Sequence, residues 1–64
     1  MTIGERITAL RKARKWPRRT VALMTGYSEQ SIINWERGTY TPSRDAVRAL
    51  ERVFGEQLQK EDER

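Results

Sequence analysis

The chain has 64 residues and contains no Cys and no His. This length allows one small domain at most, and a single core of that size is thin without a further source of stability. The missing Cys and His exclude a disulfide framework and a thiolate zinc site, and they remove the usual imidazole base. We therefore expect no enzyme, no cofactor and no metal site, and stability from packed helices, oligomerisation or both.

Positive charge is concentrated in the first two thirds of the chain. Lys and Arg number 13 against 9 Asp and Glu, which gives a net charge of +4. Residues 1–44 carry nine of the cations and three of the anions, whereas residues 45–64 have a net charge of −2. This asymmetry favours a basic face for a polyanion, nucleic acid before a membrane surface. A solvated charged surface is the plainer alternative.

No stretch of the sequence is apolar enough for a membrane span or a signal peptide, because the longest apolar run is Val21–Met24. Together with the missing Cys, this predicts a cytoplasmic protein that does not enter a membrane. The composition changes only near the polar end. We therefore divide the chain into a domain over residues 1–55 and a polar tail over residues 56–64.

Apolar residues recur at helical spacing, and no segment alternates with a period of two for more than a few residues. A first helix is predicted over residues 2–15. Its inner face carries Ile3, Ile7, Leu10, Arg11 and Arg14. Trp16 ends this helix, because the residue before a proline is disfavoured in the α region. Pro17 also suits the start of a second helix over residues 18–25, where a missing N–H costs nothing.

Two further helices follow in the sequence. The third is predicted over residues 29–37, with Ile32 and Trp35 pointing inward. The fourth begins near Ser43 and ends at Gly55. Its inward residues are Ala46, Val47, Leu50, Val53 and Phe54. The expected fold is all-α, a compact bundle of four short helices, with a polar tail that frays or forms a short fifth helix.

Gly26-Tyr27-Ser28 separates the second and third helices and is typical of a helix-turn-helix connection. Such a turn needs a residue that tolerates the left-handed region, an apolar residue against the core and a cap for the next helix. The three residues supply these in order. A generic helical hairpin has the same needs, so the turn alone does not define the function.

Several motifs along residues 2–55 have the spacing of one known family. They are Ile3 to Ile7, Leu10 to Arg14, Val21-Ala22, Gly26, Ser28, Ile32, Trp35-Glu36-Arg37-Gly38 and Thr41-Pro42-Ser43. In these residues the chain resembles the Xre/Cro/phage-repressor family, the lambda repressor-like helix-turn-helix domains. The resemblance implies a DNA-binding regulator whose third helix enters the major groove.

One face of the third helix is expected to read bases. At about 100° per residue, the side opposite the inward pair carries Gln30, Ile33, Asn34 and Arg37. Amide side chains pair with adenine, and an aliphatic side chain packs on a thymine methyl. Ile33 as an ordinary exposed residue or a dimer contact is the alternative. Glu29, on the first turn, either accepts a hydrogen bond from cytosine or favours the helix dipole.

A rim of residues around this face is expected to contact phosphates. It comprises Arg18, Arg19, Ser28, Arg37, Thr39, Tyr40 and Arg44. At the start of its second helix the family has a hydroxyl cap followed by a bracing Gln. Here Pro17 and Arg18 take those places, which removes the capping box and leaves Arg18 to reach phosphate by charge. Each Arg could instead be a solvated surface charge.

Two pairs of residues are expected to be structural. The resemblance implies a salt bridge between Arg11 and Glu36, tying the first helix to the third. Trp16 and Trp35 are expected in the core, since so small a domain needs their area. Stacking of these rings on single-stranded nucleic acid is the alternative.

The leading hypothesis is a sequence-specific double-stranded DNA-binding regulator, a small bacterial or phage repressor. It would bind a near-palindromic operator as a homodimer, with half-sites about one helical turn apart. One alternative is an antitoxin or adaptor that docks a protein through Leu23 and Ile33. Another is the DNA-binding fragment of a longer regulator.

Dimerisation in free solution is expected to be weak. After Gly55 the only apolar residue is Leu58, too little for a specific interface of about 1,200–2,000 Å². We expect pairing to be completed on DNA, through a contact near Phe54 and Leu58. The competing expectation is that Phe54 lies wholly in the core and no dimer patch exists there.

Overall fold

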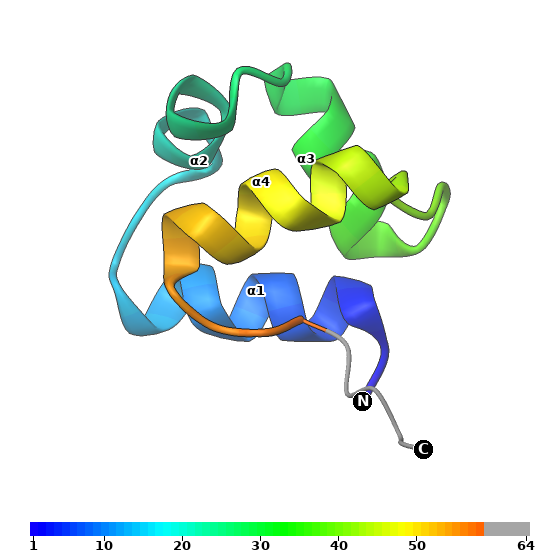
Figure 1. The fold of residues 1–64 in the computed structure, drawn as a ribbon, viewed down its shortest axis with the longest axis horizontal. Helices are drawn as coiled ribbons and strands as arrows, with labels where there is room; N and C mark the ends of the chain where they lie inside the picture. Colours follow the sequence, from blue (N-terminus) through cyan, green and yellow to red (C-terminus); the bar gives the residue numbers. More distant parts are fainter. Residues whose placement is uncertain (59–64) are drawn as a thin grey trace.

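The computed structural model describes residues 1–58, and this part of the chain folds into four helices without a strand. The helices are α1 (Ile3–Ala13), α2 (Arg18–Thr25), α3 (Glu29–Arg37) and α4 (Arg44–Phe54). Figure 1 shows α4 crossing the middle of the molecule, with α1 on one side and α2 and α3 on the other. The all-α bundle of four short helices is confirmed.

The helix ends follow local capping chemistry. Thr2 and Glu5 form a reciprocal capping box at the start of α1. This helix ends at Ala13, two residues before the predicted end, because Lys15 takes a left-handed conformation with a φ of 58°. The N–H groups of Lys15 and Trp16 donate to the carbonyls of Lys12 and Arg11, a Schellman closure that the proline signal did not reveal.

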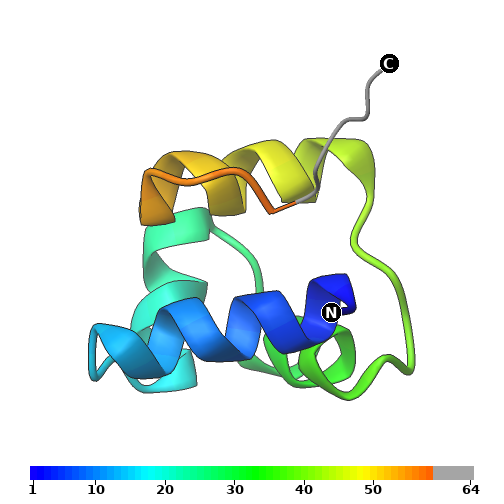
Figure 2. The ribbon, with the colours of Figure 1, turned by 90° about the horizontal axis from the view of Figure 1, so that it is seen from below.

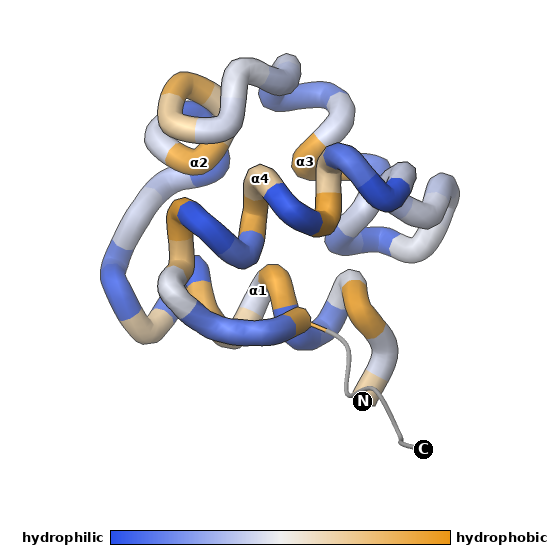
Figure 3. Tube along the Cα trace, viewed as in Figure 1, coloured by the Kyte–Doolittle hydropathy of each residue, from blue (hydrophilic) through white to orange (hydrophobic). Residues whose placement is uncertain are grey.

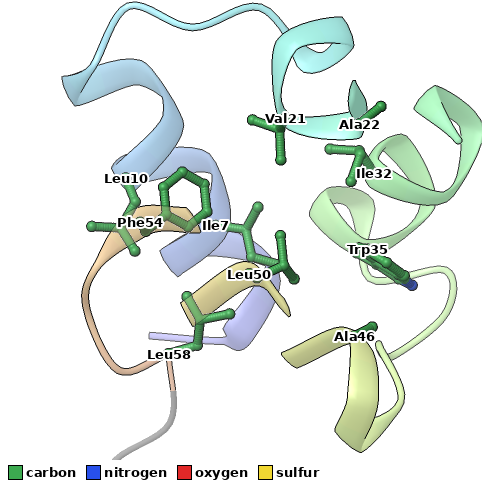
Figure 4. Close-up of a cluster of buried hydrophobic side chains, with 10 residues drawn as sticks. All are labelled: Ile7, Leu10, Val21, Ala22, Ile32, Trp35, Ala46, Leu50, Phe54 and Leu58. Carbon is green, nitrogen blue, oxygen red and sulfur yellow. The ribbon is translucent and has the colours of Figure 1, made fainter. Parts of the chain in front are cut away.

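Apolar side chains from all four helices meet in one core. Figure 3 shows hydrophobic and hydrophilic residues alternating in short blocks along the helices, as amphipathic helices require. Figure 4 shows the ten buried side chains, of which five are fully buried: Ile7, Val21, Ile32, Ala46 and Leu50. The ten are Ile7, Leu10, Val21, Ala22, Ile32, Trp35, Ala46, Leu50, Phe54 and Leu58. Trp35 is therefore a core residue, as predicted.

The end of the described chain folds back onto the domain. Figure 2 shows the segment after α4 returning along the bundle toward the N-terminus. The N–H of Leu58 donates to the Glu51 carboxylate at 3.0 Å, and Arg6 forms an ion pair with Glu56 at 3.2 Å. Residues 56–58 therefore pack against α1 and α4. Residues 59–64, to which the prediction of a polar tail or fifth helix also applies, lie outside the described residues.

An aromatic cluster covers this end of the core. Trp16 is half-buried and stacks on Phe54 with ring centroids 5.9 Å apart. Phe54 is 2% exposed and Leu58 is 6% exposed. Both side chains are therefore covered by their own protomer, and a dimer contact near them stays a prediction. The competing expectation, that Phe54 belongs to the core, is confirmed.

The helices of residues 1–58 are all short, and none combines the length and apolar character needed to cross a membrane.

Candidate nucleic-acid interface

The turn between α2 and α3 fixes how these helices cross. Gly26 has a φ of 85°, in the left-handed region that glycine adopts without steric cost. Tyr27 packs edge-on against Trp35 with ring centroids 5.2 Å apart, so it anchors the turn to the core. Ser28 begins α3, and its Oγ accepts a hydrogen bond from the N–H of Ser31. All three roles expected for this turn are confirmed.

α3 presents a polar face away from the core. Gln30 and Arg37 are exposed, whereas Ile33 and Asn34 are half-buried. The Gln30 amide donates from Nε2 to Asn34 Oδ1 at 3.2 Å, one helical turn away. The two amides that were expected to read bases are therefore neighbours, and each keeps further donor and acceptor capacity beside this bond. Glu29 is exposed on the first turn, where its charge also suits the helix dipole.

Three of the predicted rim residues are exposed on elements other than α3. Arg19 lies on α2, Arg44 opens α4, and Tyr40 is 65% exposed in the loop between α3 and α4. The loop is held to α3, because the N–H of Thr39 donates to the Asn34 carbonyl at 2.9 Å. Ser28 differs from these rim residues, because its hydroxyl is already engaged at the start of α3. The hydroxyl donates to Ser31 Oγ at 3.0 Å in addition to its capping bond.

Three helices meet at the carboxylate of Glu36. Arg11 of α1 donates from Nε to Oε2 at 2.6 Å and from Nη2 to Oε1 at 3.1 Å. Arg18 of α2 donates from Nε to the same Oε1 at 3.0 Å. The Glu36 side chain is 3% exposed. The salt bridge implied by the family resemblance is therefore present, and it has a second cation that the sequence did not predict.

The charge state of Glu36 follows from this arrangement. Burial alone would raise the pKa of Glu36, because a carboxylate is poorly solvated there. Hydrogen bonds and positive charge from Arg11 and Arg18 outweigh burial and hold the pKa below its ordinary value of 4.5. Glu36 is thus ionised at neutral pH and acts as the shared acceptor of two guanidinium groups.

Gly4 lets α1 approach the last turn of α3. A Cβ placed on Gly4 would overlap the Trp35 carbonyl oxygen and lie 3.0 Å from the Glu36 carbonyl oxygen. The backbones of the two helices therefore touch beside the Arg11–Glu36 pair. Sequence reasoning placed Gly4 within the family motif but did not assign it this role, because a glycine in a helix carries no signal of what packs on it.

Arg14, predicted on the inner face of the first helix, is engaged at the edge of the core. Arg14 donates from Nη2 to the Phe54 carbonyl at 2.6 Å and lies over the rings of Trp16 and Phe54. It therefore covers the core edge and is not free for a phosphate.

Leu23 is 76% exposed, as expected from its place on α2, and its neighbour Met24 is 50% exposed. Residues 1–58 contain no cluster of acidic side chains that could hold a metal ion.

Comparison with known proteins agrees with this geometry. A family model described as Helix-turn-helix (HTH_3) matches residues 7–60, which include the whole of α2, α3 and α4. No curated protein matches the chain. Because the family match covers most of the sequence, the chain belongs to the Xre and lambda repressor-like helix-turn-helix family of DNA-binding regulators.

Proposed function

We propose that the protein is a sequence-specific transcriptional regulator, a small bacterial or phage repressor, that inserts α3 into the major groove. The observation that carries this proposal is the polar side of α3, where the exposed Gln30 amide is bonded to the half-buried Asn34 amide beside half-buried Ile33. Amides offer the donor and acceptor pair that adenine requires in the major groove. If this face of α3 bound no partner, an aliphatic residue such as Ile33 would add little stability from its place among the amides.

The proposed roles divide the interface in two. Bases are read by Glu29, Gln30, Ile33 and Asn34. Phosphates are contacted by Arg18, Arg19, Ser28, Arg37, Thr39, Tyr40 and Arg44. The exposed positions of all seven rim residues support this division, as does the excess of cations in residues 1–44. Phosphate contacts set the register of a protein on DNA, whereas base contacts set its sequence preference.

The proposed binding mode is two protomers on a near-palindromic operator, with half-sites about one helical turn apart. The homodimer is weak in free solution, because the described apolar residues near the chain end are used in the core. Two half-sites on one duplex raise the effective concentration of the second protomer, which completes pairing on DNA.

Selection of bound duplexes from a random pool tests the proposal. We expect enrichment of a short motif, and affinity for it that falls steeply with salt. With roughly 4–6 phosphate contacts per half-site, the log–log slope per half-site should be about −0.9 for each contact. Arg52→Ala is the matched control, since it removes an exposed cation of α4 outside the proposed rim. No enriched motif, or a flat response to salt, would refute the proposal.

A second candidate function is docking of a protein partner, as in an antitoxin or adaptor. Adjacent exposure of Leu23 and Met24 at the end of α2 favours it, since an apolar patch on a surface often marks a contact. Ile33, the other residue considered for such docking, is half-buried. Leu23→Ser should leave DNA affinity unchanged and abolish binding to a protein partner if this surface is used.

A further inference from the structure

We infer that Glu36 is a positioning residue that orients the Arg18 guanidinium toward a DNA phosphate. The inference rests on the proposed function, because it assigns a role to Glu36 within the same DNA-binding surface. It goes beyond the salt bridge with Arg11, which ties α1 to α3. The new element is the hydrogen bond from Arg18 of α2 to the buried carboxylate. Arg18 stands at the position where the family has Gln.

The geometry leaves part of Arg18 free while fixing the rest. Nε donates to Glu36 Oε1 at 3.0 Å. Neither Nη1 nor Nη2 of Arg18 has a hydrogen-bond partner among residues 1–58. The side chain is 43% exposed, whereas that of Glu36 is 3% exposed. The Nε–H of the guanidinium is therefore held by the buried Glu36 carboxylate. The terminal nitrogens Nη1 and Nη2 are available to an acceptor on a bound partner.

Glu36 is itself held in place. Arg11 donates to both of its oxygens, and Arg11 Nη1 also donates to the Trp16 carbonyl at 3.1 Å. The carboxylate therefore has a fixed position before Arg18 binds it. Holding a flexible side chain in its bound geometry reduces the conformational entropy lost on association.

The charge of the cluster favours a phosphate rather than a neutral contact. Two guanidinium groups share the single carboxylate of Glu36, so the group of Arg11, Arg18 and Glu36 keeps one net positive charge. Arg11 is buried, which leaves Arg18 as the accessible cation. A planar guanidinium can bond a carboxylate and a phosphate at the same time, whereas the single ammonium of Lys cannot present two fixed edges.

A double-mutant cycle on the selected duplex tests the inference. We expect Glu36→Gln to weaken binding about tenfold, in the range of lost charged hydrogen bonds, and to do so less than twofold when Arg18 is already Ala. Affinities are corrected for the folded fraction measured by circular dichroism. An equal loss in both backgrounds would show that Glu36 acts only on the fold, and stronger binding would show that Glu36 draws Arg18 away from DNA.

Conservative replacement of Arg18 gives a second readout that does not depend on Glu36 variants. Arg18→Ala should reduce the magnitude of the salt slope by about 0.9, as expected for one lost phosphate contact. Arg18→Lys should recover less than half of the lost affinity. Arg52→Lys, at an exposed residue of α4 outside the proposed rim, is the matched control and should bind like the parent. Full recovery by Arg18→Lys would overturn the inference, because charge alone would then suffice.

NMR of the parent protein follows the Arg18 bond directly and needs no folded Glu36 variant. The Nε–H signal, assigned by its loss in Arg18→Lys, should keep its chemical shift and slow exchange when the duplex is added. The Nη signals of Arg18 should shift. Release of Nε–H into fast exchange on DNA binding would overturn the inference. Failure of every variant and of the parent to bind any duplex would instead refute the proposed function.

Discussion

Arg11 holds Glu36 by two hydrogen bonds, of 2.6 and 3.1 Å, and both side chains are almost removed from solvent. Taking two charges out of water is costly, so such a pair adds little net stability compared with apolar residues. Removing one partner of the pair is strongly destabilising, because the other charge then remains buried without compensation. The pair therefore fixes where α3 sits on α1 more than it stabilises the fold.

Glu36→Ala should lower the free energy of unfolding by about 3–5 kcal/mol, as for a broken buried pair. A domain of this size has little stability to lose, so this variant is expected to be largely unfolded. The measurement is chemical denaturation followed by circular dichroism. Glu29→Ala, which removes an exposed Glu of the same helix, should cost less than about 1 kcal/mol. Equal midpoints for the two variants would contradict the burial of Glu36.

Stability should depend on pH through Glu36. Its pKa in the folded state is lowered by Arg11 and Arg18, so its ionised form is favoured more in the folded than in the unfolded chain. The stabilisation is therefore complete above about pH 4.5 and is lost as the pH falls through the lowered folded-state pKa. Denaturation midpoints of the parent should fall across this window more steeply than those of Glu36→Gln. Parallel curves would show that other carboxylates dominate the acid response.

The sequence predicts the helices well because their signals are local. Pro17, Gly26 and Ser28 act on the backbone beside them, and the structure places a helix boundary at each. The end of α1 was missed because Lys15 adopts a left-handed conformation that ordinary residue preferences do not indicate. The packing of Leu58 was missed for another reason: its burial depends on the chain folding back over α1, which spacing within one helix cannot show.

Gly4→Ala should destabilise the protein although alanine is the better helix former. Helix propensity alone would favour Ala by about 1 kcal/mol in a helix. The added Cβ would overlap the Trp35 carbonyl oxygen, and a backbone neighbour cannot rotate away. We expect a net loss of about 1–3 kcal/mol, typical of overpacking. Ala9→Gly, at an exposed site of the same helix, is the control and should cost about 1 kcal/mol through propensity alone. A stabilised Gly4→Ala variant would contradict the close approach of α1 and α3.

Gln30→Ala and Asn34→Ala should each weaken binding to the selected duplex by about 1–3 kcal/mol and relax the preference at a defined base pair. Arg18→Ala, by contrast, should weaken all duplexes about equally, as a phosphate contact does. Repeating the selection with each variant measures both effects. An unchanged motif for Gln30→Ala would show that this face of α3 does not read bases. Because Gln30 and Asn34 are bonded, their double variant should lose less than the sum of the two.

The candidate interface was harder to predict than the fold because its contacts join distant parts of the chain. The helical period identifies the exposed side of α3, and the structure gives that side to Gln30 and Arg37 as expected. The same period cannot show that Arg18 reaches Glu36, since the bond spans two helices and a turn. A departure from the family at Arg18 was the available signal, because a guanidinium in place of Gln can form an ion pair with a carboxylate.

Leu58→Ala should destabilise each protomer and leave the association state unchanged. Leu58 is buried against its own chain, so truncation creates a cavity with an expected cost of about 2–5 kcal/mol. Val53→Ala, at a half-buried residue of α4, is the milder control. Denaturation measures the cost, and sedimentation at micromolar concentration measures association with and without a duplex carrying two half-sites.

The sedimentation result also tests the weak dimer. Because Phe54 and Leu58 are covered by their own protomer, the large exposed apolar residues left on the described surface are few, with Leu23 and Met24 adjacent on α2. Two side chains cannot bury the roughly 1,200 Å² of a stable interface. We therefore expect a monomer or weak dimer in free solution and a two-protomer complex on DNA. A tight dimer without DNA would contradict this, and Leu23→Ser would then show whether α2 forms the interface.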